Sequence, residues 1–304
     1  MYRKIIVGYD GSSQAKDALA LAKLLADVVH AELCLGAVFP LRLPLRGGLA
    51  PVLSEAEREL EHELPEAASA VGATARPVQS GSPARGLYDL AEETGADLLV
   101  VGSSKRGRLG QTLLGNVAVA LMHGSPCAVA VAPRGYAEHP DPRLSAIVVG
   151  YDGSPESQLA LEQACELAPA SAASLRLVSV AEPPMVSLAA TSGGASYGWQ
   201  TLQDAINAQA RQQLEQGRSS VPDDIPVETT LMSGSAANAL TEAARAPGSI
   251  LLLGSRAYGP LRRVLLGSVS RELVSSAPCP LIVHPRGLHE SPTTTRTAAE
   301  ATTG

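Results

Sequence analysis

Aromatic side chains are scarce in this chain: its 304 residues include one Trp and one Phe, although 45% of all residues are hydrophobic. The core must therefore be built mainly from aliphatic side chains, as is usual where helices cover both faces of a parallel sheet. No apolar run reaches the ~18 residues that a membrane-spanning helix needs. The short run after residues 1–4 ends at Asp10, so no signal peptide is expected. We expect a soluble, cytoplasmic protein.

The chain also lacks a cysteine motif and an excess of positive charge. Its cysteines show no Cys-x-x-Cys or Cys-His spacing, and each lies in or beside an apolar run, so we expect buried, reduced thiols. The formal net charge of -6 gives no general attraction to nucleic acid or to an anionic membrane surface. Neither is expected as a partner. The four cysteines are Cys34, Cys127, Cys165 and Cys279.

An internal repeat is the main feature that the chain does contain. Residues 5–12 read IIVGYDGS and residues 147–154 read IVVGYDGS, and a Gly-rich segment follows each about a hundred residues later. Two domains also agree with the usual scale of ~150 residues for one. The stretch after residue 285 is rich in Thr, Ala and Glu and has little to bury. We predict domains at 1–135 and 145–286, a linker at 136–144 and a disordered tail at 287–304.

The two copies differ in length. Equivalent residues are 142 positions apart at Val38 and Val180 but 153 apart at Gly81 and Gly234. The extra residues therefore lie in and around 183–199. Because this segment is rich in Pro, Gly and Ser, we predict a long loop, which could act as a lid or as a partner surface.

Apolar patterns predict five strands in each half, separated by helices. One helix is expected to begin at Ser12 or Ser13, and another at the capping box of Ser54 and Glu57. Such alternation implies a parallel sheet with right-handed crossovers. The strands are predicted at 4–9, 32–38, 73–79, 97–101 and 127–132, and at 146–151, 174–180, 227–232, 249–253 and 280–284.

Two kinds of segment fall at the carboxyl ends of the predicted strands, where parallel sheets collect ligands. The first is the turn that carries Asp10, with Asp152 in the second copy. These carboxylates could accept hydrogen bonds from ribose hydroxyls or an adenine edge, or they could only organise the strand-to-helix turn. The second is the Gly-rich loop at 102–116, with its counterpart at 254–268, whose backbone N–H groups suit an anion.

Each Gly-rich loop also carries three cations, which either bind phosphate or are ordinary surface charges. The loops are not Walker A loops, because Leu109 and Pro260 stand where that motif needs other residues. The histidines occupy no equivalent positions in the two halves, and no Ser-His-Asp ordering recurs, so we predict no catalytic residue. The cations are Lys105, Arg106 and Arg108, and Arg256, Arg262 and Arg263.

These motifs together resemble the universal stress protein family. The similar segments are 7–12, 98–103, 113–115 and 125–131 in the first half, and 253–255, 265–268 and 277–283 in the second. The resemblance covers about residues 3–133 and 145–285. It implies two tandem doubly wound α/β domains, each a five-stranded mostly parallel sheet flanked by helices, of the adenine nucleotide alpha hydrolase-like kind. It also implies an internal pseudo-dimer through the last strands, while a further homodimer stays open.

The ATP-binding branch of that family carries Gly, two residues, Gly, nine residues, Gly, then Ser or Thr. Here the middle glycine is replaced by Lys105 and Ala257, and the final hydroxyl is Asn116 in the first half but Ser268 in the second. The second half therefore resembles an ATP site more closely. The residues that the resemblance implies would bind the nucleotide are Gly8, Asp10, Val38, Gly102, Arg108, Gly115 and Asn116 in the first half, and Gly150, Asp152, Val180, Gly254, Arg262, Gly267, Ser268 and Val269 in the second.

The resemblance implies that the protein binds ATP, with Mg²⁺ held mostly by phosphate oxygens and water, and acts as a nucleotide-responsive stress regulator. Two alternatives stay open. One is a slow ATPase or autophosphorylating enzyme. The other is a nucleotide-free module that binds an unknown protein partner.

Overall fold

Strands and helices alternate along the chain in the computed structural model, which describes residues 1–41, 54–103, 116–138, 143–183, 196–255, 267–276 and 278–284. The first half contains β1 (Lys4–Gly8), α1 (Ser13–Val29), β2 (Glu32–Pro40), α2 (Glu55–Ala70), β3 (Thr74–Ser80), α3 (Pro83–Thr94), β4 (Leu98–Gly102), α4 (Asn116–Met122) and β5 (Ala128–Ala132). The second contains β6 (Ala146–Gly150), α5 (Pro155–Ser171), β7 (Ser174–Ala181), α6 (Ser196–Ser219), β8 (Val227–Ser233), α7 (Ala236–Ala243), β9 (Ser249–Gly254), α8 (Ser268–Ser276) and β10 (Leu281–His284). All ten predicted strands are confirmed to within one or two residues.

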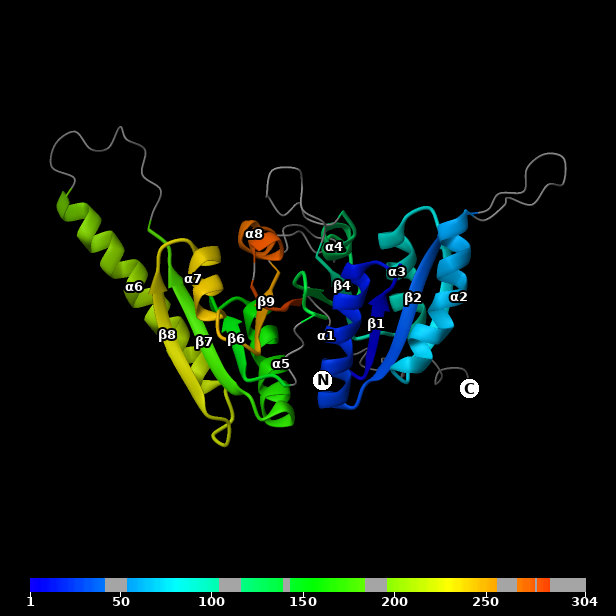
Figure 1. The fold of residues 1–304 in the computed structure, drawn as a ribbon. Coiled ribbons are helices and arrows are strands. Elements are labelled where there is room, and N and C mark those ends of the chain that lie inside the picture. The colour runs from blue at the N-terminus through cyan, green and yellow to red at the C-terminus, as the bar shows by residue number, and fades with distance from the viewer. Residues whose placement is uncertain are drawn as a thin grey trace, which may run out of the picture.

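The two halves share one sheet of ten strands, in the order β3-β2-β1-β4-β5-β10-β9-β6-β7-β8 (Figure 1). Within each half the neighbouring strands are parallel, as the expected α/β fold requires. The halves meet at β5 and β10, which are antiparallel and place Val131 opposite Leu281 and Val129 opposite Val283. This pairing of the last strands was expected from the family resemblance, and it makes the two five-stranded sheets continuous.

Both faces of the sheet are covered over its inner strands, which explains why strands such as β4, β5 and β6 are almost wholly apolar, whereas the edge strands β3 and β8 are partly exposed and carry polar residues. Successive residues of β1 point to opposite faces: Ile5 and Val7 pack in one core cluster with α1, α2, α5 and α6, and Ile6 packs in a second with α3, α4, α7 and α8. Helices α1 and α5 contact each other across the seam between the halves (Figure 1). The aliphatic core inferred from the composition is therefore two layers, one on each face.

Serine side chains set the beginning of several helices. The Ser12 hydroxyl accepts the N–H of Ala15 and caps α1, which decides between Ser12 and Ser13. The predicted capping box of α2 is confirmed: Ser54 Oγ accepts the N–H of Glu57, and Glu57 Oε2 accepts the N–H of Ser54 at 2.7 Å. Ser154 caps α5 as Ser12 caps α1.

Helix α6 is longer than its counterpart α2, with 24 residues against 16. Glu63 of α2 and Gln213 of α6 lie against the equivalent Gly11 and Gly153, so the additional turns belong to the N-terminal end of α6. Residues 196–199, expected in a loop, instead form its first turn, because a helix extends readily once later turns are packed. The remaining loop residues, 184–195, lie outside the described part of the chain.

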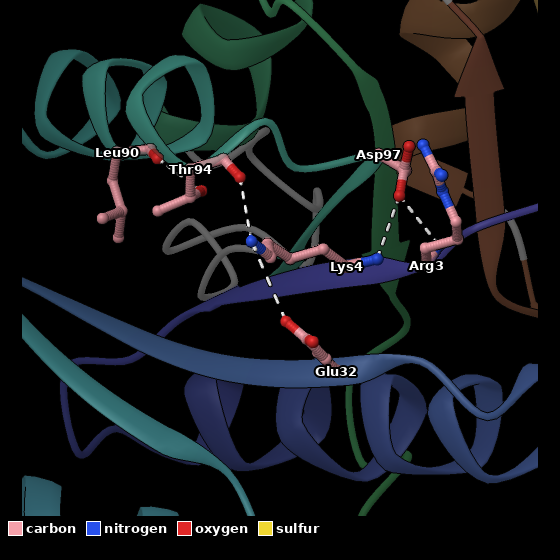
Figure 2. A network of polar contacts seen from close by, with 6 residues as sticks. All are labelled: Arg3, Lys4, Glu32, Leu90, Thr94 and Asp97. Carbon is pink, nitrogen blue, oxygen red and sulfur yellow. Dashed lines mark hydrogen bonds and ion pairs between the residues drawn. The ribbon is translucent and has the colours of Figure 1, made fainter.

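Polar contacts fasten the amino-terminal edge of the sheet, opposite the carboxyl ends of the strands. The Asp97 carboxylate accepts the N–H groups of Arg3 and Lys4 at 2.8 and 2.9 Å, and Lys4 Nζ donates to the carbonyl of Thr94 (Figure 2). Lys4 also pairs with Glu32 at 3.8 Å. These contacts join β1 to the α3–β4 connection and leave the other edge to the candidate site.

Two further contacts tie distant parts of the chain together. Tyr2 and His284 stack at the seam, and their Oη and Nε2 atoms are 2.7 Å apart. The carboxylate of Asp17, a residue of α1 that is only 4% exposed, accepts the N–H groups of Gly135 and Ala137 at 2.9 and 2.8 Å. The segment after β5 is thereby held on α1.

Candidate functional site

The strand order reverses between β1 and β4 and again between β6 and β9. In parallel sheets, ligands bind at such a point, beyond the carboxyl ends of the strands. In the second half this edge contains a cavity of about 400 Å³. Its walls come from the ends of β6, β7 and β9, from one face of α6, and from the beginnings of α7 and α8. The lining residues include Gly150, Asp152, Val180, Gly254, Gly267, Ser268 and Val269.

Those seven residues are all but one of the site residues predicted for the second half. The exception is Arg262, which lies outside the described residues. The structure brings these seven residues together around one cavity. That they contact a nucleotide stays a prediction. Val178, Leu240 and Leu253 line the cavity and belong to one apolar core cluster, while its polar lining residues include Ser154, Gln209 and Gln213.

The predicted aspartates organise the turn between strand and helix. Asp152 Oδ1 accepts the backbone N–H and the hydroxyl of Ser154 at 3.1 and 2.5 Å, and Asp10 makes the same two bonds with Ser12. Gly11 and Gly153, the residues between them, adopt a left-handed φ of 74°. Both carboxylates therefore organise the strand-to-helix turn, and in the second half these bonds hold Asp152 at the cavity wall.

Gly102 and Gly254 have a packing role that the sequence did not reveal. A Cβ on Gly254 would lie 2.3 Å from the carbonyl carbon of Glu156, and one on Gly102 would lie 2.1 Å from the carbonyl oxygen of Gln14. The first turn of the following helix, α5 or α1, thus approaches the end of the strand closely. Glycine is required there whether or not a ligand binds.

The beginning of α8 forms one end of the cavity. Gly267 precedes the helix, and Ser268, Val269 and Ser270 of its first turn line the cavity. The first N–H groups of a helix have no partner within the helix, and together with the helix dipole they favour negative charge. This end of the cavity is therefore suited to an anionic group.

Helix α6 supplies a wall that sequence reasoning missed. Ile206, Gln209, Ala210 and Gln213 line the cavity from one helix face, since they are three or four positions apart. Glu182 also lines it, and its Oε1 accepts the N–H of Ala236 at the beginning of α7 at 2.9 Å. Helical spacing alone could have grouped the α6 residues, but only the fold shows which face meets the site.

In the first half, Gly8, Asp10, Val38 and Gly102 lie at the equivalent ends of β1, β2 and β4. Gly115 and Arg108 lie outside the described residues. Asn116 is the first residue of α4, and its counterpart Ser268 is the first residue of α8.

Tyrosines beside the two turns have different partners. Tyr9 donates its hydroxyl to Glu63 Oε1 at 2.6 Å, whereas Tyr151 donates to Gln158 Oε1 at 3.0 Å. Burial, then the hydrogen bond to Glu63 and its negative charge, raises the pKa of Tyr9. For Tyr151, burial and then the charge of Asp152 raise the pKa.

The cysteines are not part of this site. All four are free; Cys34, Cys127 and Cys279 are buried, and Cys165 is partly buried. Burial raises the pKa of Cys127 and of Cys279 to about 12, so both thiols stay protonated near neutral pH.

Within the described ranges, no group of three or more His, Cys, Asp or Glu residues is arranged to hold a metal ion. No helix in those ranges has the length and apolar character needed to cross a membrane.

Comparison with known proteins gives consistent matches. The sequence model of the Universal stress protein family matches residues 1–133 and again residues 144–285. A universal stress protein of Mycobacterium tuberculosis is 30% identical over 300 residues, which covers 92% of this chain and 99% of the relative. A universal stress protein structure from Archaeoglobus fulgidus covers 93% of this chain and 98% of its own at 21% identity and a TM-score of 0.64. A solved universal stress protein in complex with cAMP is 30% identical, covers 44% of this chain and 98% of its own, and has a TM-score of 0.36.

Proposed function

Since the chain belongs to the universal stress protein family and carries the family's domain twice, we propose that it binds ATP in the cavity of its second half. We further propose that this binding makes the protein a nucleotide-responsive regulator in a stress response. The observation that carries the proposal is the cavity itself, which gathers seven of the eight predicted ligands of that half. Its volume of about 400 Å³ lies in the range usual for small-molecule sites.

The chemistry of the walls suits the three parts of a nucleotide. Val178, Leu240 and Leu253 offer an apolar surface for the base. Asp152 offers a carboxylate for ribose hydroxyls, since Oδ1 is already held in place by Ser154. The first turn of α8 offers N–H groups and a positive helix end for phosphate, with the hydroxyl of Ser268 beside it.

Magnesium, when it accompanies ATP, would be held mainly by phosphate oxygens and water. Arg262 would add positive charge at the phosphates. Both statements extend the family resemblance.

The test is calorimetric titration of the full chain with ATP, with AMP and cAMP measured alongside, on wild type and on Ser268→Ala and Asn116→Ala. A hydrogen bond to a charged group is worth about 1.5–3 kcal/mol, so Ser268→Ala should weaken ATP binding about tenfold or more. Asn116→Ala, the matched change in the first half, should have little effect. Equal effects would contradict the assignment to the second half, and the absence of ATP binding by wild type would refute the proposal.

A further inference from the structure

The two halves present different charges to their equivalent sites. A Cβ on Gly11 would lie 3.0 Å from Glu63 Oε2, and one on Gly153 would lie 3.1 Å from Gln213 Cγ. Glu63 of α2 and Gln213 of α6 therefore occupy the same place beside the same turn. The next residue in each helix, Leu64 or Leu214, is buried, which supports this register.

The difference extends one turn along the helices. Gln209, four residues before Gln213, also lines the cavity of the second half. In the same register its counterpart in α2 is Glu59. The face that meets the site thus carries two glutamines in α6 and two glutamates in α2.

Glu63 is held toward its site by a specific contact. Tyr9, at the end of β1, donates its hydroxyl to Glu63 Oε1 at 2.6 Å, and the charge of Glu63 contributes to the raised pKa of Tyr9. In the second half Tyr151 donates to Gln158 instead. Beside its turn, the first half therefore has a carboxylate held by Tyr9 at the place where the second half has Gln213.

Among the described residues that line the cavity of the second half, Glu182 is a carboxylate besides Asp152. Its Oε1 accepts the N–H of Ala236 at the beginning of α7, where the helix dipole favours negative charge. Its counterpart in the first half is Pro40. Glu182 is thus stabilised by α7, whereas Glu63 faces the turn of Asp10.

We propose that this helix face selects the half that accepts an anionic ligand. A glutamine side chain can both donate and accept hydrogen bonds, so Gln213 and Gln209 admit the nucleotide of the proposed function to the second half. A glutamate carboxylate can only accept hydrogen bonds, and its negative charge repels phosphate. Glu63 and Glu59 therefore exclude polyphosphate from the first half. This inference rests on the proposed function and adds its specificity-determining residues.

The first test places the charge of the first half into the second. Gln213→Glu is nearly isosteric, and it should weaken ATP binding about tenfold, which corresponds to about 1.4 kcal/mol. Binding of adenosine, which has no phosphate, should change by no more than about twofold. Raising the ionic strength from 0.01 to 0.15 M shortens the screening length from about 30 to about 8 Å, so the loss for ATP should shrink.

Gln212→Glu is the matched control. Gln212 is exposed and precedes Gln213 in α6, so this substitution adds the same negative charge on a neighbouring position that faces solvent. It should leave ATP binding within about twofold of wild type. A thermal melt of each variant checks that the fold is retained. The reverse exchange, Glu59→Gln with Glu63→Gln, should add a second, weaker ATP-binding event to the wild-type one.

The outcomes separate the two proposals. If wild type binds ATP and Gln213→Glu behaves as Gln212→Glu does, this inference is wrong and the proposed function stands. Two equal ATP sites in wild type would also overturn the inference alone. If wild type binds no ATP, both proposals fall.

Discussion

Asp17 offers a sharp test of how the segment after β5 is held. Its carboxylate is almost fully buried and accepts two backbone N–H groups, from Gly135 and Ala137, at 2.9 and 2.8 Å. Replacement of Asp17 by Ala removes both bonds. Each hydrogen bond to a charged group is worth about 1.5–3 kcal/mol. Because Gly135 and Ala137 are only partly buried, water can replace part of the loss, and we expect the lower end, about 3 kcal/mol in all.

The assay is urea unfolding followed by circular dichroism. With a slope of about 2–3 kcal/mol/M, Asp17→Ala should lower the midpoint by about 1 M or more. Asp17→Asn keeps one acceptor oxygen and should lose about half as much. Asp27→Ala, on the same helix, removes only an exposed ion pair with Lys23, worth about 0.3–0.5 kcal/mol.

The order of the midpoints decides the result. Wild type and Asp27→Ala should lie close together, Asp17→Asn below them and Asp17→Ala lowest. A midpoint for Asp17→Ala equal to that of Asp27→Ala would refute the reasoning, because it would mean that the two hydrogen bonds contribute nothing to stability.

Two more predictions concern reactivity and packing. Burial, followed by the negative charges of Glu162 and Glu166, raises the pKa of Cys165 to about 11. Because the thiolate is the reactive form, the rate of Cys165 alkylation, measured by mass spectrometry, should rise about tenfold per pH unit up to about pH 11. A rate that levels off near pH 9 would contradict this pKa. A Cβ at position 254 would collide with the backbone of Glu156, whereas one at Gly81 would lie 3.8 Å from its nearest neighbour, Leu41 Cδ1. Gly254→Ala should therefore cost about 2 kcal/mol or more, seen as a lower Tm in calorimetry, while Gly81→Ala should stay near wild type; equal Tm values for the two variants would show that the close approach does not matter.

Local patterns predicted the inner strands of the sheet because these strands are covered on both faces. Residues 147–149 read IVV and are fully apolar, which marks a buried strand without reference to the rest of the fold. Ser54 and Glu57 likewise define the beginning of α2 through contacts only three residues apart. Even the pairing of β5 with β10 followed from the family resemblance.

The missing parts depend on contacts between distant segments. The first turn of α6 contains Ser196 and Gly198, which favour helix weakly, so its sequence suggested a loop. Gln209 and Gln213 belong to no motif, and their place at the cavity depends on how α6 packs against β7 and β8. The packing reason for Gly254 depends on Glu156, almost a hundred residues away.

The antiparallel seam of β5 and β10 has a consequence for how the two halves could diverge. A single-domain protein that protected its last strand by pairing with a second copy would depend on concentration, and any substitution would appear in both copies. Fusion makes the partner permanently available at a high effective concentration. It also allows each half to change alone, so one chain can hold Glu63 in one copy and Gln213 in the other. The duplication thus gives this protein an asymmetry that an identical pair of subunits could not encode.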